Sequence, residues 1–316
     1  MATYNGEKYI IEQLDSIRLQ TQPPDEVIMC DDVSSDNTVQ VVKSYIEEYG
    51  LDNWQIIENE KNLGYYDNFF KTIFMSRGDT IYLSDQDDVW DLNKIKTFEA
   101  LYAEKPEAMM IQSNVKFIDS LGRPLRTREP YHLIPDTGEL IKLPAESMCK
   151  HQGSGYTMSF RREVSDVIEK NSLDKLKEGH RFHDVLLGIA AIALGDCYLD
   201  QRIYDKHRLH DSNATRRSGT SSVSDRTKAK QLEIVTSRVQ DFSTMLNYCT
   251  DDKREILEQF RDVAQKRKDL IERFSPRKFF RVAGVRKYYS SKLGVFTDLM
   301  YSLGLEKLLL FMYKHI

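Results

Sequence analysis

The sequence predicts an α/β fold built on a doubly wound sheet, with a smaller helical region after it. Two observations lead to this prediction. In the first part of the chain, short apolar runs rich in β-branched residues alternate with stretches whose apolar residues have helical spacing. Toward the end of the chain, only the helical spacing remains. Because parallel strands end at one common edge, we expect a ligand site where acidic residues follow the apolar runs.

The composition is that of a globular protein with one large domain and a smaller one. The chain has 316 residues, of which 41% are hydrophobic, and this is ample material for a core. The 45 lysine and arginine residues stand against 49 aspartate and glutamate residues, which gives a net charge of -4. This balance argues against a general nucleic-acid-binding protein, so we expect no nucleic acid among the partners.

The four cysteines and the apolar runs bear on the cellular location. The cysteines lie far apart and form no CxxC pair, so neither a zinc ribbon nor a disulfide framework is predicted, and we expect a reducing compartment. No signal peptide is recognised, and the longest apolar runs, 185–194 and 308–313, are too short to cross a bilayer core of about 30 Å. We expect a cytoplasmic protein whose contact with the inner face of the cell membrane is at most peripheral.

The chain opens with the end of a strand, a polar turn and a helix. Almost nothing of the strand is present, since only Met1 precedes Ala2. The helix is indicated by apolar residues that share one face, namely Ile10, Ile11, Leu14 and Ile17. A second buried strand, 26–30, is followed directly by Asp31 and Asp32 and then by another helix. A helix cap would not require this pair of carboxylates.

A third strand is predicted at 54–58, and the polar segment after it leads into a helix that runs to Met75. The fourth strand, 80–83, is short and apolar. A helix at 92–102 and a strand at 109–115 follow. This alternation predicts that at least three strand ends converge on one edge of the sheet.

Three carboxylates, Asp85, Asp87 and Asp88, follow the fourth strand within four residues. Like charges so close together repel one another, which destabilises a fold unless a cation gathers them. One interpretation is therefore a site for a divalent metal ion at the edge of the sheet. The alternative is an acidic loop that leads to a helix N-cap at Asp91.

Four short motifs follow one another over about ninety residues. They are Ala2-Thr3-Tyr4-Asn5-Gly6, Asp31-Asp32-x-Ser34-x-Asp36-x-Thr38, Asn62-x-Gly64 and Asp85-Gln86-Asp87-Asp88. In this order they resemble the family 2 glycosyltransferases, which have the GT-A fold. The form Asp-Gln-Asp-Asp-x-Trp is similar to that of bacterial rhamnosyltransferase-like members. The resemblance covers residues 1–215, so we expect a catalytic domain at 1–215 and a helical C-terminal domain at 216–316.

The resemblance implies which residues bind the donor. Tyr4 and Asp32 would hold the nucleotide base and ribose, and Asn68 would lie near the donor. The full set implied for nucleotide-sugar binding is Ala2, Tyr4, Asp32, Gly64, Asn68, Asp85, Gly153 and Ser154. Gly153 and Gly155 let the backbone approach a ligand, although residues 149–160 are equally consistent with a simple loop that enters a strand.

The implied cofactor is Mn²⁺ or Mg²⁺. Asp85 and Asp87 would form the metal-binding pair, with Asp87 as the direct ligand. Carboxylate oxygens suit these hard cations, and the bound ion neutralises a departing diphosphate. His210 would complete the metal shell or touch the diphosphate, unless it is simply solvated; the segment around it resembles a Tyr-Arg-x-His-x-x-Asn pattern in which His207 replaces the tyrosine.

Asp184 is the candidate catalytic base. An apolar run follows it immediately, so it stands in the opening turn of a buried helix, where capping is its other role. The resemblance implies that its carboxylate takes the proton of the acceptor hydroxyl. The neighbouring His183 either orients a substrate or faces solvent. Residues 123–147 contain four prolines and predict a long excursion, either a lid or an acceptor loop.

The C-terminal region is predicted to begin with a mobile linker at 211–230, which is rich in Ser, Thr, Arg and Lys. Two stretches of helical spacing follow it. The tail, residues 275–316, carries eight Lys or Arg residues against two acidic ones, a local net charge of +6, with aromatic residues interleaved. Such helices can lie on an anionic membrane surface. They can also pack on the catalytic domain or on a second subunit, so a homo-oligomer stays open.

The activity that the resemblance implies is a single inverting displacement. It would transfer a hexose or deoxyhexose, with rhamnose as the first guess and glucose, galactose or an N-acetylhexosamine as alternatives. The donor would be linked to dTDP or UDP, and the acceptor would be a hydroxyl of a cell-surface glycan or lipid-linked saccharide. A magnesium-dependent phosphotransfer protein and a non-catalytic nucleotide-sugar-binding relative are the competing hypotheses. Because the family normally begins with a complete hydrophobic strand, we expect apolar residues added before Met1 to raise thermal stability.

Overall fold

The computed structural model describes residues 1–125, 136–150, 153–173, 182–211, 213, 227–291 and 293–315. Two compact units interleave along the chain. The first comprises Met1–Leu143, Gly153–Lys170 and Gly195–Leu209, and the second comprises Pro144–Gln152, Asn171–Leu194 and His210–Ile316. The boundary at residue 215 between a family domain and a helical appendage stays a prediction. Much of the predicted lid and most of the predicted linker lie outside the described residues.

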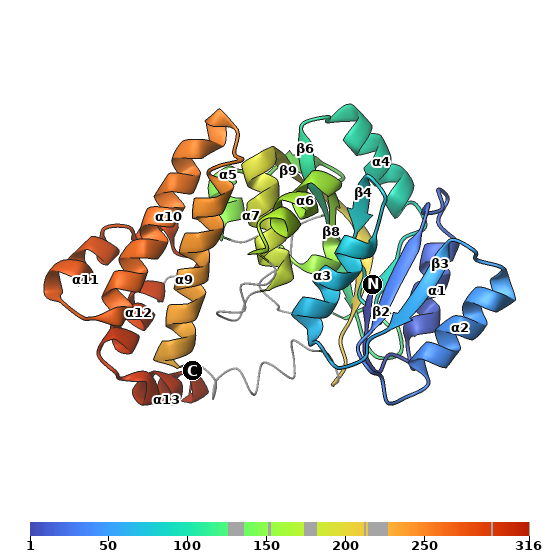
Figure 1. Ribbon diagram of the computed structural model, residues 1–316, viewed down its shortest axis with the longest axis horizontal. Coiled ribbons are helices and arrows are strands. Elements are labelled where there is room, and N and C mark those ends of the chain that lie inside the picture. Colours follow the sequence, from blue (N-terminus) through green and yellow to red (C-terminus); the bar gives the residue numbers. More distant parts are fainter. Residues whose placement is uncertain are drawn as a thin grey trace. The chain divides into compact units, whose positions relative to one another are not determined.

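The first unit begins with a parallel sheet of three strands in the order β1-β2-β3. The strands are β1 (Ala2–Thr3), β2 (Val27–Asp31) and β3 (Trp54–Glu58), and the helices that alternate with them are α1 (Ile10–Arg18), α2 (Thr38–Tyr49) and α3 (Tyr65–Met75) (Figure 1). Every residue of β2 is buried. The predicted elements are therefore confirmed here, and Ile10, Leu14 and Ile17 are buried on one face of α1. The prediction that Ile11 shares this face is wrong, because adjacent residues of a helix point about 100° apart and Ile11 is exposed.

A second sheet in the same unit has the order β4-β8-β6-β9-β5, with β7 paired to β9. Its strands are β4 (Thr80–Tyr82), β5 (Val89–Trp90), β6 (Ala108–Ile118), β7 (Leu140–Lys142), β8 (Met158–Arg161) and β9 (Asp196–Arg208). Strands β6 and β9 are parallel, whereas β4, β5 and β7 each pair in antiparallel fashion. Helices α4 (Lys94–Glu104) and α6 (Arg162–Lys170) follow β5 and β8. The predicted α/β class is confirmed.

The predicted sheet is divided in two among the described residues, and β1 is a short strand. Strand β1 pairs with β2 through Ala2 and Thr3 alone. Strand β4 pairs with β8, and β1 and β4 are therefore edges of separate sheets among the described residues. The segment after the acidic residues also differs from the prediction. It forms β5, and α4 begins at Lys94 after Asn93, so Asp91 is not the N-cap of that helix.

The second unit is helical. Its helices are α5 (Ala145–Lys150), α7 (His183–Leu194), α9 (Lys228–Met245), α10 (Asp251–Glu272), α11 (Pro276–Ala283), α12 (Gly294–Ser302) and α13 (Glu306–His315), with a short 3₁₀ turn, η3 (Arg286–Tyr288). Helices α9 and α10 correspond to the two stretches of helical spacing. The side chains that pack between helices include Val235, Ile271 and Met300. None of the helices that the structure describes combines the length and the apolar character needed to span a membrane.

Candidate functional site

The acidic segment after β4, residues 85–88, is hydrogen-bonded to the residue that follows β1. The backbone N–H of Tyr4 donates to Oε1 of Gln86 at 2.9 Å, and Nε2 of Gln86 donates back to the carbonyl of Tyr4 at 2.9 Å. Gly6 leaves room for this pair, since a Cβ at that position would lie 2.3 Å from Oε1 of Gln86. The side chain of Tyr4 is 46% exposed, as a residue that offers its ring to a ligand would be.

Asp88 lies inside this segment and is only 1% exposed. Its Oδ1 and Oδ2 lie 2.9 and 3.1 Å from Nδ1 of His207, near the end of β9, and the backbone N–H of Arg208 donates to Oδ1 at 3.0 Å. Charge-assisted hydrogen bonds of this kind are stronger than neutral ones. The last two residues of β9 therefore fix the position of the acidic segment.

Arg208, the last residue of β9, also holds the acidic segment in position, and its side chain is only 1% exposed. Its Nε donates to the backbone carbonyl of Asp87 at 2.9 Å. Its Nη2 donates to Oε2 of Glu12 on α1. The guanidinium also lies over the ring of Tyr9, 4.8 Å from the centroid. Arginine is suited to this role because its planar group keeps its charge and has five donors in fixed directions.

Asp85, Asp88 and His207 form a candidate metal site. One ligand atom from each lies within 4.8 Å of the others. Carboxylate oxygens with an imidazole nitrogen are a donor set that Mn²⁺ accepts, and a carboxylate hydrogen-bonded to a ligating histidine is a common arrangement in metal sites. Asp85 was predicted as a metal residue. Asp88 was one of the three carboxylates for which a shared cation was predicted, whereas His207 was not expected at the site, and the metal roles predicted for Asp87 and His210 stay predictions.

The electrostatics around His207 favour a cation. Burial alone lowers its pKa, but the carboxylates at positions 88, 85 and 87 outweigh burial and raise the pKa of His207 to about 9. The ring stacks on Tyr156, with centroids 4.1 Å apart and planes at 4°. The raised pKa reports a concentration of negative charge at this edge of the sheet.

A buried ion pair joins strand β9 to the first residue of helix α4. Nζ of Lys94 is 2.6 Å from Oδ1 of Asp205, and both side chains are inaccessible to solvent. Ser113 donates to the other oxygen of Asp205, and the Lys94 ammonium lies 4.1 Å from the centroid of Trp90. Burial lowers the pKa of Lys94 and raises that of Asp205, while each charge opposes the shift of the other.

Asp32 is buried, and its carboxylate holds the turn before α3. Oδ1 accepts from the backbone N–H of Leu63 at 2.7 Å, and Oδ2 accepts from that of Gly64 at 2.8 Å. Gly64 has a φ of +81°, a conformation that favours glycine. Asp32 therefore positions this turn, and its predicted contact with the base or ribose stays a prediction.

Asn68 is also buried, and both ends of its amide are hydrogen-bonded. Its Nδ2 donates to the carbonyl of Cys30 at 2.8 Å, and its Oδ1 accepts from Asn59 at 2.8 Å. These bonds tie α3 to β2, at the same edge as Asp32. A direct contact between Asn68 and the donor stays a prediction.

Gly153 and Ser154 precede the 3₁₀ turn η1 (Gly155–Thr157) that leads into β8, and the donor contact predicted for them stays a prediction. Gly153 has a φ of +90°, and a Cβ there would meet Oε1 of Gln112 at 1.9 Å. The carbonyl of Ser154 accepts from the N–H of Thr157 at 3.0 Å. The glycine is thus required by a close approach to β6.

Asp184 and His210 belong to the second unit. Asp184 stands in the first turn of α7, as predicted, and its Oδ1 accepts from the N–H of Val185 at 2.7 Å. Burial lowers the pKa of His183, and the Asp184 carboxylate opposes that shift. The N–H of His210 donates to Oδ1 of Asn213 at 2.5 Å.

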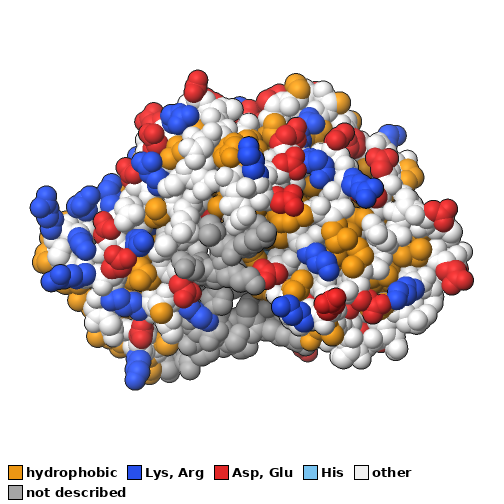
Figure 2. Space-filling model, in the orientation of Figure 1, with side chains coloured by type: hydrophobic (Ala, Val, Ile, Leu, Met, Phe, Trp, Pro, Cys, Tyr) orange, Lys and Arg blue, Asp and Glu red, His pale blue; other side chains and the backbone are white. Residues whose placement is uncertain are grey.

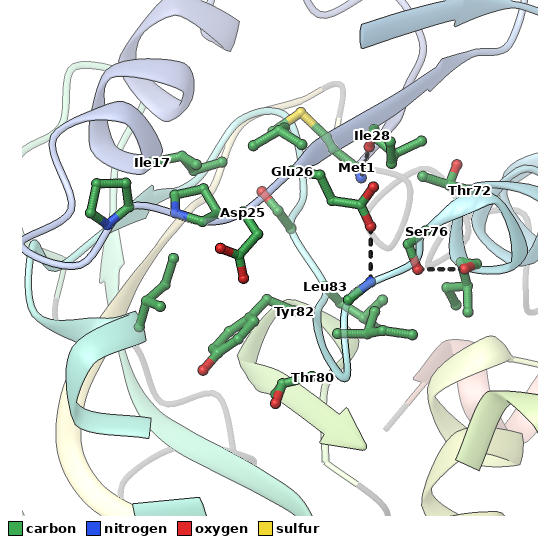
Figure 3. Close-up of a pocket in the computed structure, with 18 of the residues that line it drawn as sticks. Met1, Ile17, Asp25, Glu26, Ile28, Thr72, Ser76, Thr80, Tyr82 and Leu83 are labelled. Atoms are coloured by element: carbon green, nitrogen blue, oxygen red, sulfur yellow. Dashed lines mark hydrogen bonds between the residues drawn. The ribbon is translucent and has the colours of Figure 1, made fainter. Parts of the chain in front are cut away.

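A cavity of about 380 Å³ has none of the candidate metal ligands Asp85, Asp88 and His207 in its lining. It is lined by Met1, by the start of β2 and by β4 (Figure 3). The Met1 ammonium donates to the carbonyl of Ile28 at 2.8 Å, and burial lowers its pKa to about 6. The cavity is therefore lined by residues of both sheets, at β1–β2 and at β4.

Several of these residues carried a signal that sequence reasoning did not use. Gln86 stands inside the acidic motif, and His207 and Arg208 stand inside the segment that resembles the Tyr-Arg-x-His-x-x-Asn pattern. Lys94 gave no signal, because lysines are rarely buried and nothing in its surroundings marks it.

Comparison with solved structures shows the fold. Residues 1–349 of TarS from Staphylococcus aureus, solved with UDP-GlcNAc, superpose with a TM-score of 0.62 at 15% identity, over 97% of this chain and 90% of that one. A mannosyltransferase from Pyrobaculum calidifontis, solved with GDP-Man and Mn²⁺, gives a TM-score of 0.53 at 15% identity, over 96% and 85%. The GT-A type of α/β fold is thereby confirmed.

Sequence comparison shows the family. RfbG of Shigella flexneri, a dTDP-rhamnosyl transferase, is 38% identical over 103 residues, which are 30% of this chain and 34% of that protein. TarS is 29% identical over 124 residues, 39% of this chain and 21% of that protein. The chain thus spans about a third or less of these relatives' length. The model of glycosyl transferase family 2 matches residues 1–167, and the chain belongs to this family.

Proposed function

We propose that the protein is an inverting, metal-dependent glycosyltransferase that moves a sugar from a nucleoside diphosphate donor to a hydroxyl of a glycan or lipid-linked saccharide. The observation that supports this most is the acidic segment at the edge of the sheet. It is fastened by Gln86 to β1 and by Arg208 to β9, and its ligand atoms lie within 4.8 Å of one another. Fixed carboxylates at that edge suit a cation that accompanies a diphosphate.

Asp85, Asp88 and His207 would hold Mn²⁺ or Mg²⁺, and Asp87 would join them as in the family pattern. When bound, the ion neutralises charge that develops on the leaving diphosphate. The chain's own residues position the donor: the Tyr4 ring is exposed beside the Gln86 fastening, and Asp32 holds the turn at Gly64 against β2. Both contacts support a nucleotide bound across the ends of β1 and β2.

Asp184 is proposed as the general base. Val185 holds one carboxylate oxygen through its N–H, which orients the group and leaves the second oxygen to accept the proton of the acceptor hydroxyl. A positioned base contributes about 10²- to 10⁴-fold in rate. The attacking oxygen then displaces the diphosphate in one step, with inversion at the anomeric carbon.

The proposed donor is dTDP-rhamnose, with UDP-linked hexoses as the next candidates. The support is the local similarity to RfbG, a dTDP-rhamnosyl transferase that is 38% identical over 103 residues, whereas the TarS structure was solved with UDP-GlcNAc. The phosphotransfer hypothesis loses support, because Asp31 accepts hydrogen bonds from Thr3 and Ser34 and Asp32 holds the Gly64 turn. Neither carboxylate is presented as a nucleophile.

Substitution of Asp184 tests the catalytic role. Asp184→Asn should lower kcat by about 10²- to 10⁴-fold and leave the donor Kd unchanged, because the base acts on the acceptor. Asp251→Asn is the matched control, since Asp251 occupies the first turn of α10 as Asp184 does that of α7. Equal turnover in both variants would mean that Asp184 is only a helix-terminal charge. Donor binding without turnover in the unmodified protein would support a non-catalytic relative.

A further inference from the structure

Helix α11 and the residues on either side of it carry an unusual local charge. Residues 273–287 contain six lysine or arginine residues and no acidic residue, in a chain whose net charge is -4. The next acidic residue along the chain, Asp298, is fully buried and paired with Arg267, 2.8 Å from its Nε. It therefore adds nothing to the surface charge. Such a single-signed stretch attracts an anionic partner.

The outward face of α11 is both basic and apolar. Arg277, Phe280 and Arg281 are exposed and lie three and four positions apart, which places them on one face of the helix. Phe280 is 71% exposed. On the opposite face, Val282 is fully buried and Phe279 packs against the same hydrophobic cluster. The helix is thus anchored from within, and Phe280 takes no part in that core.

The positive charges on this face have few acidic neighbours among the residues that the structure describes. In the described part of the second unit, no carboxylate pairs with Arg273, Arg277 or Arg281. Lys278 differs, because its Nζ donates to the carbonyls of Asp269 and Arg273 at the end of α10. Figure 2 shows Lys and Arg side chains gathered over α11, at the left of the view, with hydrophobic side chains between them.

We propose that this α11 surface, made of Arg273, Phe274, Arg277, Phe280, Arg281 and Arg286, binds an anionic lipid bilayer. Arginines at the level of the headgroups interact with lipid phosphates, and an exposed phenylalanine gains free energy when it enters the acyl boundary. The apolar component favours a bilayer over nucleic acid, whose phosphate backbone offers Phe280 no hydrocarbon. The proposal does not depend on the transferase reaction, and its test does not use turnover.

The test is sedimentation of the full chain with vesicles of phosphatidylcholine alone and of phosphatidylcholine mixed with phosphatidylglycerol. Binding should require the anionic lipid and weaken as salt is raised. The double substitution Arg277→Gln and Arg281→Gln should weaken binding roughly 30-fold, since each charge near the surface contributes about 1 kcal/mol. Phe280→Ser keeps the charge and should weaken binding about tenfold, as expected for loss of a buried aromatic side chain.

The control is the double substitution Arg77→Gln and Lys96→Gln, which removes the same charge from exposed positions of the first unit and should bind like the unmodified protein. All substituted side chains are exposed, and melting curves verify that each variant folds. Equal binding to both kinds of vesicle, no binding to either, or an equal loss in the control would overturn the proposal. So would binding to duplex DNA that is as tight as binding to the anionic vesicles.

Discussion

Two regions of the first unit differ in how well their buried charges are paired: the edge of the sheet that carries the acidic segment, and the surroundings of Met1. At the site edge, Asp32, Asp88 and Lys94 are all buried, and each has hydrogen-bond or ionic partners. At the start of β1, the Met1 ammonium is buried beside a cavity of about 380 Å³ and donates a hydrogen bond to the carbonyl of Ile28. The difference teaches that the site edge is preorganised by satisfied charges, whereas the gap beside β1 is a source of instability.

The largest effect is expected from breaking the buried ion pair. Lys94→Met leaves the Asp205 carboxylate uncompensated and should lower the free energy of unfolding by about 3–5 kcal/mol. The double variant with Asp205→Leu removes both charges and should recover most of that loss. Urea unfolding of both variants measures this. If the single variant were as stable as the unmodified protein, the pair would not stabilise the site edge.

A smaller effect is expected at the cavity. The pKa of the Met1 ammonium is about 6 in the folded protein and 8.0 without burial. The unfolded chain therefore binds more protons between these values, and the free energy of unfolding should rise by up to about 3 kcal/mol as pH increases from 6 to 8. A short apolar extension before Met1 replaces the ammonium by an amide and fills the gap. It should raise Tm and abolish this pH dependence.

Equal melting temperatures for the two chains at pH 6 would contradict the account of the cavity. A polar extension of the same length, made of Ser and Gly, is the control. It removes the buried charge without filling the apolar part of the cavity, so it should abolish the pH dependence and raise Tm less than the apolar extension.

The smallest effect is expected from loss of the two hydrogen bonds between Gln86 and the backbone of Tyr4. Gly6→Ala places a Cβ 2.3 Å from Oε1 of Gln86 and should displace its amide. Loss of the two bonds to Tyr4 is worth about 1–3 kcal/mol, so the donor Kd should rise roughly tenfold. Gly78→Ala is the control, because its nearest atom would be 3.5 Å away. An unchanged Kd in Gly6→Ala would mean that Tyr4 binds the donor without this fastening.

The first sheet could be predicted from the sequence, because β2 and β3 are apolar runs and α1 has an apolar stripe. Strand β9 could not be predicted, since it buries Asp200, Asp205 and Arg208, and buried charges conceal the alternation that marks a strand. For the same reason Asp88 and His207 were not expected to meet. They pair across 119 positions of the chain, and only the register of β5 and β9 brings them together.

The most direct test of the central claim is calorimetric titration with UDP, dTDP, GDP and their sugars, each with and without Mn²⁺. We expect that one base binds, that Mn²⁺ tightens this binding by at least about tenfold, and that Asp85→Asn removes the metal effect while leaving the protein folded. Nucleotide binding that is indifferent to Mn²⁺ in the unmodified protein would contradict a metal site at the acidic edge.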